Sequence, residues 1–113
     1  MKRGEIWLVN LDPTLGAEIR KTRPCVIVND DAIGALPLKV IAPLTDLKER
    51  YRSVPWMLCL EPDADNGLSK PSAIDLFQVR CLAEVRLVRK IGEISPLHLL
   101  QVQKALKLVF GME

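Results

Sequence analysis

Short apolar runs, each ended by proline, glycine, asparagine or aspartate, are the feature that most constrains the fold of this chain. From this pattern we expect strands at residues 5–9, 25–28, 38–42, 54–60 and 72–80, the third ended by Pro43. We expect loops at residues 10–22, 46–53 and 63–71. Residues 83–91 fit no single class. Because no helices alternate with these runs, the pattern argues against a parallel α/β sheet and favours a small, bent antiparallel sheet or barrel.

The C-terminal segment is the clearest helix. Ser95 is suited to cap its first turn, and Pro96 suits the first helical position, where a missing N–H costs nothing. Gly111 is suited to end it. An apolar face follows the 3.6-residue period at Leu99, Val102, Leu106 and Val109, with Lys104 and Lys107 on the other side.

Length and charge limit the classes of protein. A chain of 113 residues, 49% of them hydrophobic, is expected to form a single domain over residues 1–113 with a core of its own. Its net charge is only +2, so it has no general basic field of the kind that binds duplex nucleic acid. If the partner is a nucleic acid, the basic residues must act by position.

The cysteines and the N-terminus indicate a compartment. Cys25, Cys59 and Cys81 have no CxxC spacing and cannot all pair within one chain, so we expect reduced, buried thiols. No signal peptide and no apolar run long enough to span a membrane are seen. A cytoplasmic location is therefore expected, with no membrane partner.

Several enzyme classes are disfavoured. The only histidine, His98, lies in the expected helix and is interpreted as a solvent-side residue, so serine and cysteine triads are not expected. There is no glycine-rich phosphate loop. Segment 63–67 resembles a calcium loop only faintly, because its glycine comes one residue early and no glutamate follows at the required distance. We expect neither a metal nor a cofactor.

Segment 17–24 (AEIRKTRP) is the most informative loop. It places one carboxylate and three cations between two expected strands, where functional residues often lie on a rigid scaffold. Pro24 disfavours helical geometry at Arg23 and favours an extended conformation at the start of the second strand. Read from the residues alone, this composition more often indicates a solvated charged loop.

Five separated motifs resemble those of the MazF/PemK family of toxins. In order they are RGEIWLVNLDPTLGAE, TRP with CVIV, APLT, GLSKPSAIDLFQVR and KIG. The resemblance extends from Arg3 to about Phe110, and the first 28 residues are its most specific part. It implies an SH3-like barrel with a C-terminal helix, the fold that gyrase-poisoning toxins share. It also implies a homodimer that cleaves single-stranded RNA without a metal and is neutralised by an antitoxin protein.

The resemblance also assigns catalytic residues. The arginine of the family's R-P step falls on Arg23, the hydroxyl residue ending the third strand on Thr45, and the glutamate of its G-x-E step on Glu18. These residue types suit attack of a 2′-hydroxyl on the adjacent phosphorus. A guanidinium matches phosphate oxygens, a hydroxyl can donate to them, and a carboxylate can accept the proton. Because arginine hardly ever loses a proton, Arg23 is assigned charge stabilisation.

The chain departs from the family pattern at three positions. Ile19 replaces a usual glutamine, Ala17 replaces a histidine found in some members, and Phe77 replaces an acidic residue before Q-x-R. The catalytic role of that acid is therefore not transferred. The residues expected to bind RNA are Arg20, Lys21, Lys48, Asp75, Phe77, Gln78 and Arg80.

Other interpretations stay open at this point. Gln78 and Arg80 are equally consistent with a structural hydrogen-bonding pair. Trp7 is expected to pack in the core or in a dimer contact, and Trp56 in the core, although its ring is also suited to stack on a base. Two alternatives to a ribonuclease are a non-catalytic barrel that binds a protein target, as the gyrase poisons do, and an inactive RNA-binding barrel.

Overall fold

The computed structural model describes all residues from 1 to 113. Its strands are β1 (Glu5–Asn10), β2 (Thr22–Ile27), β3 (Leu38–Asp46), β4 (Met57–Leu60), β5 (Ser72–Asp75), β6 (Arg80–Ala83) and β7 (Leu87–Glu93). Four 3₁₀ turns, η1 (Asp31–Ile33), η2 (Glu49–Ser53), η3 (Leu76–Gln78) and η4 (Glu84–Arg86), connect them, and helix α1 (Pro96–Val109) follows. The expectation of a mainly β fold with a C-terminal helix is confirmed.

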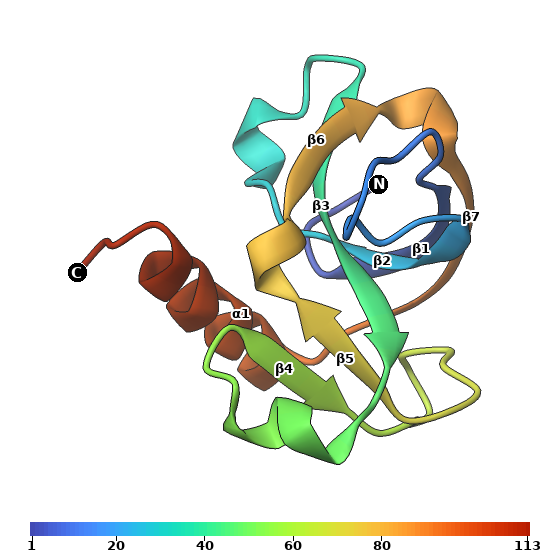
Figure 1. Cartoon of the computed structure of the whole chain (residues 1–113). Coiled ribbons are helices and arrows are strands. Elements are labelled where there is room, and N and C mark those ends of the chain that lie inside the picture. The colour runs from blue at the N-terminus through green and yellow to red at the C-terminus, as the bar shows by residue number, and fades with distance from the viewer.

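Strand β3 joins the two halves of the molecule, as Figure 1 shows. Its first part pairs with β2 and β6, and its last three residues pair with β5, all antiparallel. The predicted end of this strand at Pro43 is wrong, because β3 continues to Asp46. Pro43 lies where β3 leaves β2 and begins to pair with β5, and proline is tolerated at such irregular points of a sheet.

Two apolar clusters form the core. Strands β7, β1, β2, β3 and β6 curve into a small barrel, whose cluster is Val9, Leu11, Cys25, Ile27, Ile41, Leu82 and Leu87. The second cluster lies between the sheet and α1 and includes Ile6, Val26, Ala42, Leu44, Leu60, Ile74, Leu76, Val102 and Ala105. Neighbouring residues of β2 and β3 face different clusters, so both strands are apolar on both faces. This explains why residues 25–28 form a continuous apolar run, from which a buried strand is predicted.

The helix agrees with its sequence signals. The Ser95 hydroxyl accepts the N–H of His98 at 3.1 Å, Pro96 is in the first turn, and Gly111 has a φ of +66° just beyond the C-cap. Val102 is buried, and its neighbours on the predicted apolar face pack against the same cluster. His98 is half-buried rather than fully on the solvent side, with Nδ1 3.1 Å from the Ser95 hydroxyl. Helix α1, with 14 residues, does not reach the length of a membrane-spanning segment.

The predicted fifth strand is in fact two strands separated by the turn η3. The Asp75 carboxylate accepts the N–H of Phe77 at 3.0 Å and thereby begins this turn, so the chain leaves β5 and returns to β3 as β6. Residues 83–91, which the sequence left open, form the turn η4 and most of β7.

Three predictions of burial have different outcomes. Trp7 is half-buried, packs against the barrel cluster and donates its indole N–H to Glu5 at 3.0 Å. Trp56 is not in the core: its side chain is exposed and tilts against the ring of Phe77, with 5.7 Å between the ring centroids. Among the cysteines, Cys25 is buried and Cys59 half-buried, but Cys81 is exposed because it points outward from β6.

Candidate active site

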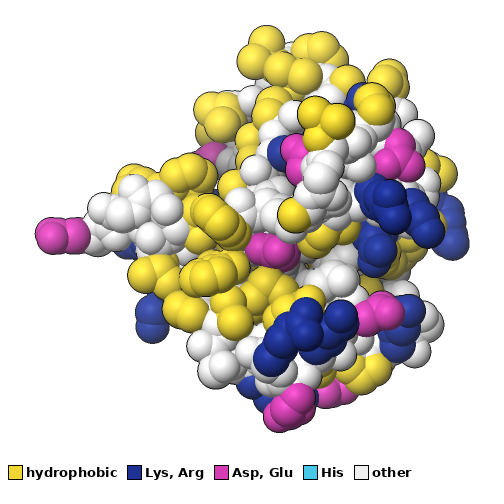
Figure 2. Space-filling view, in the orientation of Figure 1, with side chains coloured by type: hydrophobic (Ala, Val, Ile, Leu, Met, Phe, Trp, Pro, Cys, Tyr) yellow, Lys and Arg dark blue, Asp and Glu magenta, His cyan; other side chains and the backbone are white.

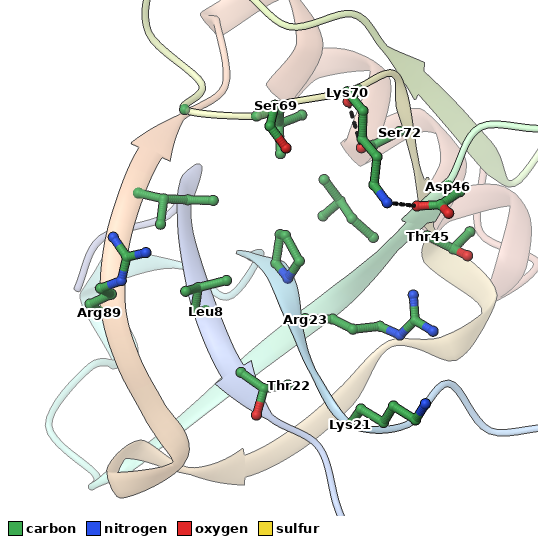
Figure 3. Close-up of a pocket in the computed structure, with 15 residues that line it drawn as sticks. Leu8, Lys21, Thr22, Arg23, Thr45, Asp46, Ser69, Lys70, Ser72 and Arg89 are labelled. Atoms are coloured by element: carbon green, nitrogen blue, oxygen red, sulfur yellow. Dashed lines mark hydrogen bonds and ion pairs between the residues drawn. The ribbon is translucent and has the colours of Figure 1, made fainter.

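A cleft of about 440 Å³ opens between the start of β2, the end of β3 and the loop before β5. Leu8 of β1 and Ile91 of β7 supply part of its apolar lining. Its charged residues are Lys21, Arg23, Asp46, Lys70 and Arg89, and its hydroxyl residues are Thr22, Thr45, Ser69 and Ser72. Figure 3 shows Arg23, Thr45 and Lys70 on one side of the cleft and Arg89 on the opposite wall.

Arg23 is the second residue of β2, at the end where the chain enters the sheet. Its backbone pairs with Val9 of β1, and the following Pro24 keeps it extended. Its side chain is half-buried, and Nε donates to the carbonyl of Arg20 at 2.9 Å. This bond fixes the direction of the guanidinium and leaves its terminal N–H groups free to bind an anion, a geometry that matches phosphate oxygens.

Thr45 reaches the same cleft from β3. It pairs with Ala73 of β5 and is half-buried, while the next residue, Asp46, is exposed at the end of the strand. The structure therefore brings together two of the three residues to which the resemblance assigns catalysis, Arg23 and Thr45. Arg23 and Thr45 are 22 residues apart in the chain, and they share one cleft because β2 and β3 are neighbours in the sheet.

Four cations and one carboxylate line this cleft. Asp46 accepts the ammonium of Lys70 at 2.9 Å. The hydrogen bond and the positive charge of Lys70 lower the pKa of Asp46, with smaller contributions from Arg23 and Lys48, so this carboxylate is ionised. The cleft keeps a net positive charge and is suited to bind a polyanion.

Glu18 does not lie in this cleft. Its carboxylate accepts the N–H of Leu15 at 2.6 Å and lines a neighbouring pocket of about 590 Å³. This second pocket is formed by Leu11, Ala17, Glu18, Ile19, Pro43, Phe77, Gln78, Val79 and Arg80. Segment 17–23 thus separates two depressions, one lined by cations and hydroxyls and the other mainly by apolar side chains and one aromatic ring.

Gln78 and Arg80 bind the backbone of the long first loop. The Gln78 amide accepts the N–H of Ile19 at 2.6 Å and donates to the carbonyl of Ala17 at 3.3 Å. The Arg80 guanidinium donates to the carbonyl of Leu11 at 3.1 Å. Both side chains therefore hold the loop that carries Glu18 and leads into β2 and Arg23, which is the structural interpretation of the Q-x-R step. They also form part of the second pocket.

The other expected RNA-binding residues are distributed around these depressions. Lys21 lines the cleft, with a φ of +73° that turns the chain into β2. Arg20 is exposed beside it, and Lys48 is exposed at the start of η2. Figure 2 shows Lys and Arg side chains gathered on the right and lower parts of one face, while hydrophobic side chains gather beside α1.

Asp75 and Phe77 are placed differently from each other. Burial raises the pKa of Asp75, whose carboxylate is occupied by the N–H of Phe77 at the start of η3. The side chain of Phe77 is 67% exposed and forms one wall of the second pocket, so its ring is accessible to a planar ligand.

Sequence reasoning missed three charged residues of the cleft, Asp46, Lys70 and Arg89. Each looks like an ordinary surface charge in the sequence, and only the pairing of β3 with β5 and of β1 with β7 brings them to the cleft. The segment SKPS around Lys70 was within a recognised motif, but the motif gave it no role. No group of three or more His, Cys, Asp or Glu side chains is arranged to hold a metal ion.

The fold defines the class: a small antiparallel β-barrel with a C-terminal helix and a cationic cleft. Solved structures of this class include a MazF protein from Deinococcus radiodurans, which matches with a TM-score of 0.81 and 21% identity. The match covers 99% of this chain and 97% of that chain. A mycobacterial endoribonuclease solved with its cognate antitoxin matches with a TM-score of 0.79 and 19% identity, covering 100% of this chain and 97% of that one. At these identities, the likeness shows the fold alone.

The sequence comparisons define the family. Residues 2–110 match the family described as PemK-like, MazF-like toxin of type II toxin-antitoxin system. The chain is 35% identical to the endoribonuclease MazF9 of Mycobacterium tuberculosis over 96% of its own length and 94% of that protein. It is 31% identical to the endoribonuclease MazF of Staphylococcus epidermidis over 99% of its own length and 92% of that protein. The chain belongs to the PemK/MazF family of toxins.

Proposed function

We propose that this chain is the ribonuclease toxin of a type II toxin–antitoxin pair and cleaves single-stranded RNA without a metal ion. The observation that carries the proposal is the meeting of Arg23 and Thr45 in a cationic cleft, on a chain whose curated relatives are named endoribonucleases. We further propose that residues 1–113 act as one domain in a cytoplasmic homodimer, neutralised by an antitoxin protein.

The proposed reaction joins the 2′-oxygen to the adjacent phosphorus and breaks the bond from phosphorus to the 5′-oxygen. The products are a 2′,3′-cyclic phosphate and a 5′-hydroxyl. Arg23 stabilises the extra negative charge on the phosphorane, and the Thr45 hydroxyl donates to a non-bridging oxygen. One preorganised donor of this kind changes kcat by about 10²–10³. The 5′-oxygen takes its proton from water, because arginine keeps its own.

Glu18 is the proposed acceptor of the 2′-hydroxyl proton, although it lines the neighbouring pocket in the free protein. Its carboxylate is bound by one loop N–H, which is an exposed contact. In the proposed RNA complex, the carboxylate exchanges this partner for the 2′-hydroxyl. Phe77 and the apolar part of the second pocket then hold a base next to the scissile phosphate, and Arg20, Lys21 and Lys48 bind flanking phosphates. Asp75, Gln78 and Arg80 hold the walls of this groove.

The test is incubation of the purified protein with a long single-stranded RNA in EDTA, beside Arg23→Ala and Arg3→Ala. Arg3 lies outside both depressions, so its variant controls for the loss of one guanidinium. We expect discrete fragments ending in 2′,3′-cyclic phosphate from the parent and from Arg3→Ala, and a loss of at least about 10²-fold with Arg23→Ala.

The other outcomes contradict the proposal in distinct ways. Full cleavage by Arg23→Ala removes the assignment of this residue. Cleavage that stops in EDTA and returns with magnesium refutes the metal-free reaction. RNA that is bound but stays intact favours the inactive RNA-binding barrel. The departures from the family pattern at Ile19 and Phe77 are consistent with that alternative. If RNA is neither bound nor cut, the barrel that binds a protein target is favoured.

A further inference from the structure

Lys70 is a cation of the cleft that the family motifs leave without a role, and its backbone position is fixed. The Ser72 hydroxyl donates to the Lys70 carbonyl at 3.0 Å, and the N–H of Leu47 donates to the Pro71 carbonyl at 3.2 Å. Pro71 also restricts Lys70 to extended backbone. The residue is therefore tied to the end of the β3–β5 ladder, where Thr45 lies.

The Lys70 side chain is directed by Asp46. Its ammonium lies 2.9 Å from the Asp46 carboxylate, and Figure 3 shows it reaching down the wall of the cleft, on the side of Arg23 and Thr45. The two side chains are 64% and 61% exposed, so the pair contributes little to the stability of the fold. An ammonium has three N–H donors, and Asp46 occupies one of them. Two donors are left for a ligand in the cleft.

The position of Asp46 makes the charge of Lys70 necessary. A carboxylate next to Thr45 repels any phosphate that approaches this hydroxyl, unless a cation compensates it. The other cations of the cleft come from β2, from the residue before it and from β7, whereas Lys70 alone comes from the β5 side of Thr45. Lys70 therefore has two conceivable roles, which are neutralisation of Asp46 alone and direct contact with the phosphate.

We propose that Lys70 is a phosphate-binding residue of this cleft, and that Asp46 holds its ammonium beside Thr45 so that the free N–H donors meet a non-bridging oxygen of an RNA phosphate. This inference rests on the proposed function, because it takes RNA as the ligand. It adds a third cationic or hydroxyl contact, from the β5 side, to the two made by Arg23 and Thr45. Direct contact is favoured over neutralisation alone because the side chain lines the cleft.

The experiment measures binding of a 2′-O-methyl oligoribonucleotide, which lacks the nucleophile, and cleavage of the matching RNA. The variants are Lys70→Ala, Asp46→Asn and the double variant, with Lys107→Ala on the outer face of α1 as the matched control. We expect Lys70→Ala to weaken binding about tenfold and to reduce the slope of log affinity against log salt by about 0.7, the value for one lost contact to a single strand. KM is expected to rise by a similar factor, with a smaller change in kcat.

The double variant separates the two roles. If Lys70 contacts the phosphate, the double variant binds as weakly as Lys70→Ala or recovers only slightly, and its salt slope stays reduced. Recovery to the parent affinity and slope means that Lys70 only neutralises Asp46, and overturns the inference. Lys70→Arg is expected to keep most of the binding, since it keeps the charge.

The parent protein distinguishes this inference from the proposed function. If the parent cleaves RNA while Lys70→Ala binds and cleaves like Lys107→Ala, the role of Lys70 is refuted and the ribonuclease assignment stands. If the parent neither binds nor cleaves RNA, the proposed function fails and the inference fails with it. Circular dichroism of each variant excludes unfolding as the cause of lost binding.

Discussion

Replacing Asn66 by alanine should loosen the loop that carries Lys70 into the cleft. The Asn66 side chain is 1% exposed and makes three hydrogen bonds to the loop backbone. Its amide oxygen accepts the N–H groups of Asp63 at 3.2 Å and Leu68 at 3.0 Å, and its nitrogen donates to the carbonyl of Glu61 at 2.9 Å. Alanine removes all three bonds and leaves these backbone groups without their partner.

The expected loss follows from these three bonds. One hydrogen bond contributes a net of about 1 kcal/mol, so the free energy of unfolding should fall by about 3 kcal/mol. Total stabilities are about 5–15 kcal/mol, so the variant should still fold. With an m-value of about 1.5 kcal/mol/M, the midpoint of urea unfolding should move by about 2 M. Parent and variant must be compared at one protein concentration, because a dimer gains stability with concentration.

Asn10→Ala is the matched control. Asn10 is exposed, and its side-chain oxygen accepts only the N–H of Asp12 at 3.1 Å, so its loss should change the midpoint by at most about 0.7 M. A shift for Asn66→Ala as small as that of the control would refute the reasoning that this side chain holds the loop. Cleavage assays on the folded Asn66→Ala protein should also show reduced activity, since the loop forms one wall of the cleft.

Two further predictions concern titratable groups. Burial raises the pKa of Glu5, but hydrogen bonds from Trp7 and the backbone of Lys2 lower it more, to about 2. The contribution of the ionised Glu5 to stability is therefore full above about pH 5, and it is lost as the pH falls from about 4.5 towards 2. Urea unfolding at pH 7 should show Glu5→Gln less stable by at most about 3 kcal/mol, and equal stability differences at pH 7 and pH 3 would contradict this. Burial raises the pKa of Cys25 to about 12, so iodoacetamide at pH 8 should label the exposed Cys81 in the native protein and Cys25 only after unfolding. Mass spectrometry of the labelled peptides checks this, and rapid native labelling of Cys25 would count against it.

The elements that the sequence predicted well are those with local signals. The helix has a cap, a proline and a glycine at its ends, and the buried strand β2 has a continuous apolar run. The boundaries that failed depend on partners distant in the chain. Whether a strand continues through Pro43 depends on the change of partner from β2 to β5, and the break after Asp75 depends on a side chain that begins a turn.

The candidate site was predicted in the same uneven way. The family motifs pointed to Arg23 and Thr45, and the sheet places both in one cleft. Composition could not show that Glu18 faces a separate pocket, because the loop geometry depends on bonds to Gln78 from a segment about 60 residues later. Lys70 was missed for the related reason that only strand register brings it beside Thr45.

The shared strand β3 also limits how proteins of this architecture can change in length. Successive residues of a strand point to opposite faces, so an insertion of one residue between Pro43 and Leu44 would exchange the faces of Leu44 and Thr45. The insertion would take an aliphatic side chain out of the core and remove the hydroxyl from the cleft at once. We therefore expect insertions and deletions to be tolerated in loops 11–21 and 61–71 and rejected within β3. Changes in the RNA sequence that such proteins recognise would then arise in the loops, while strand β3 stays unchanged.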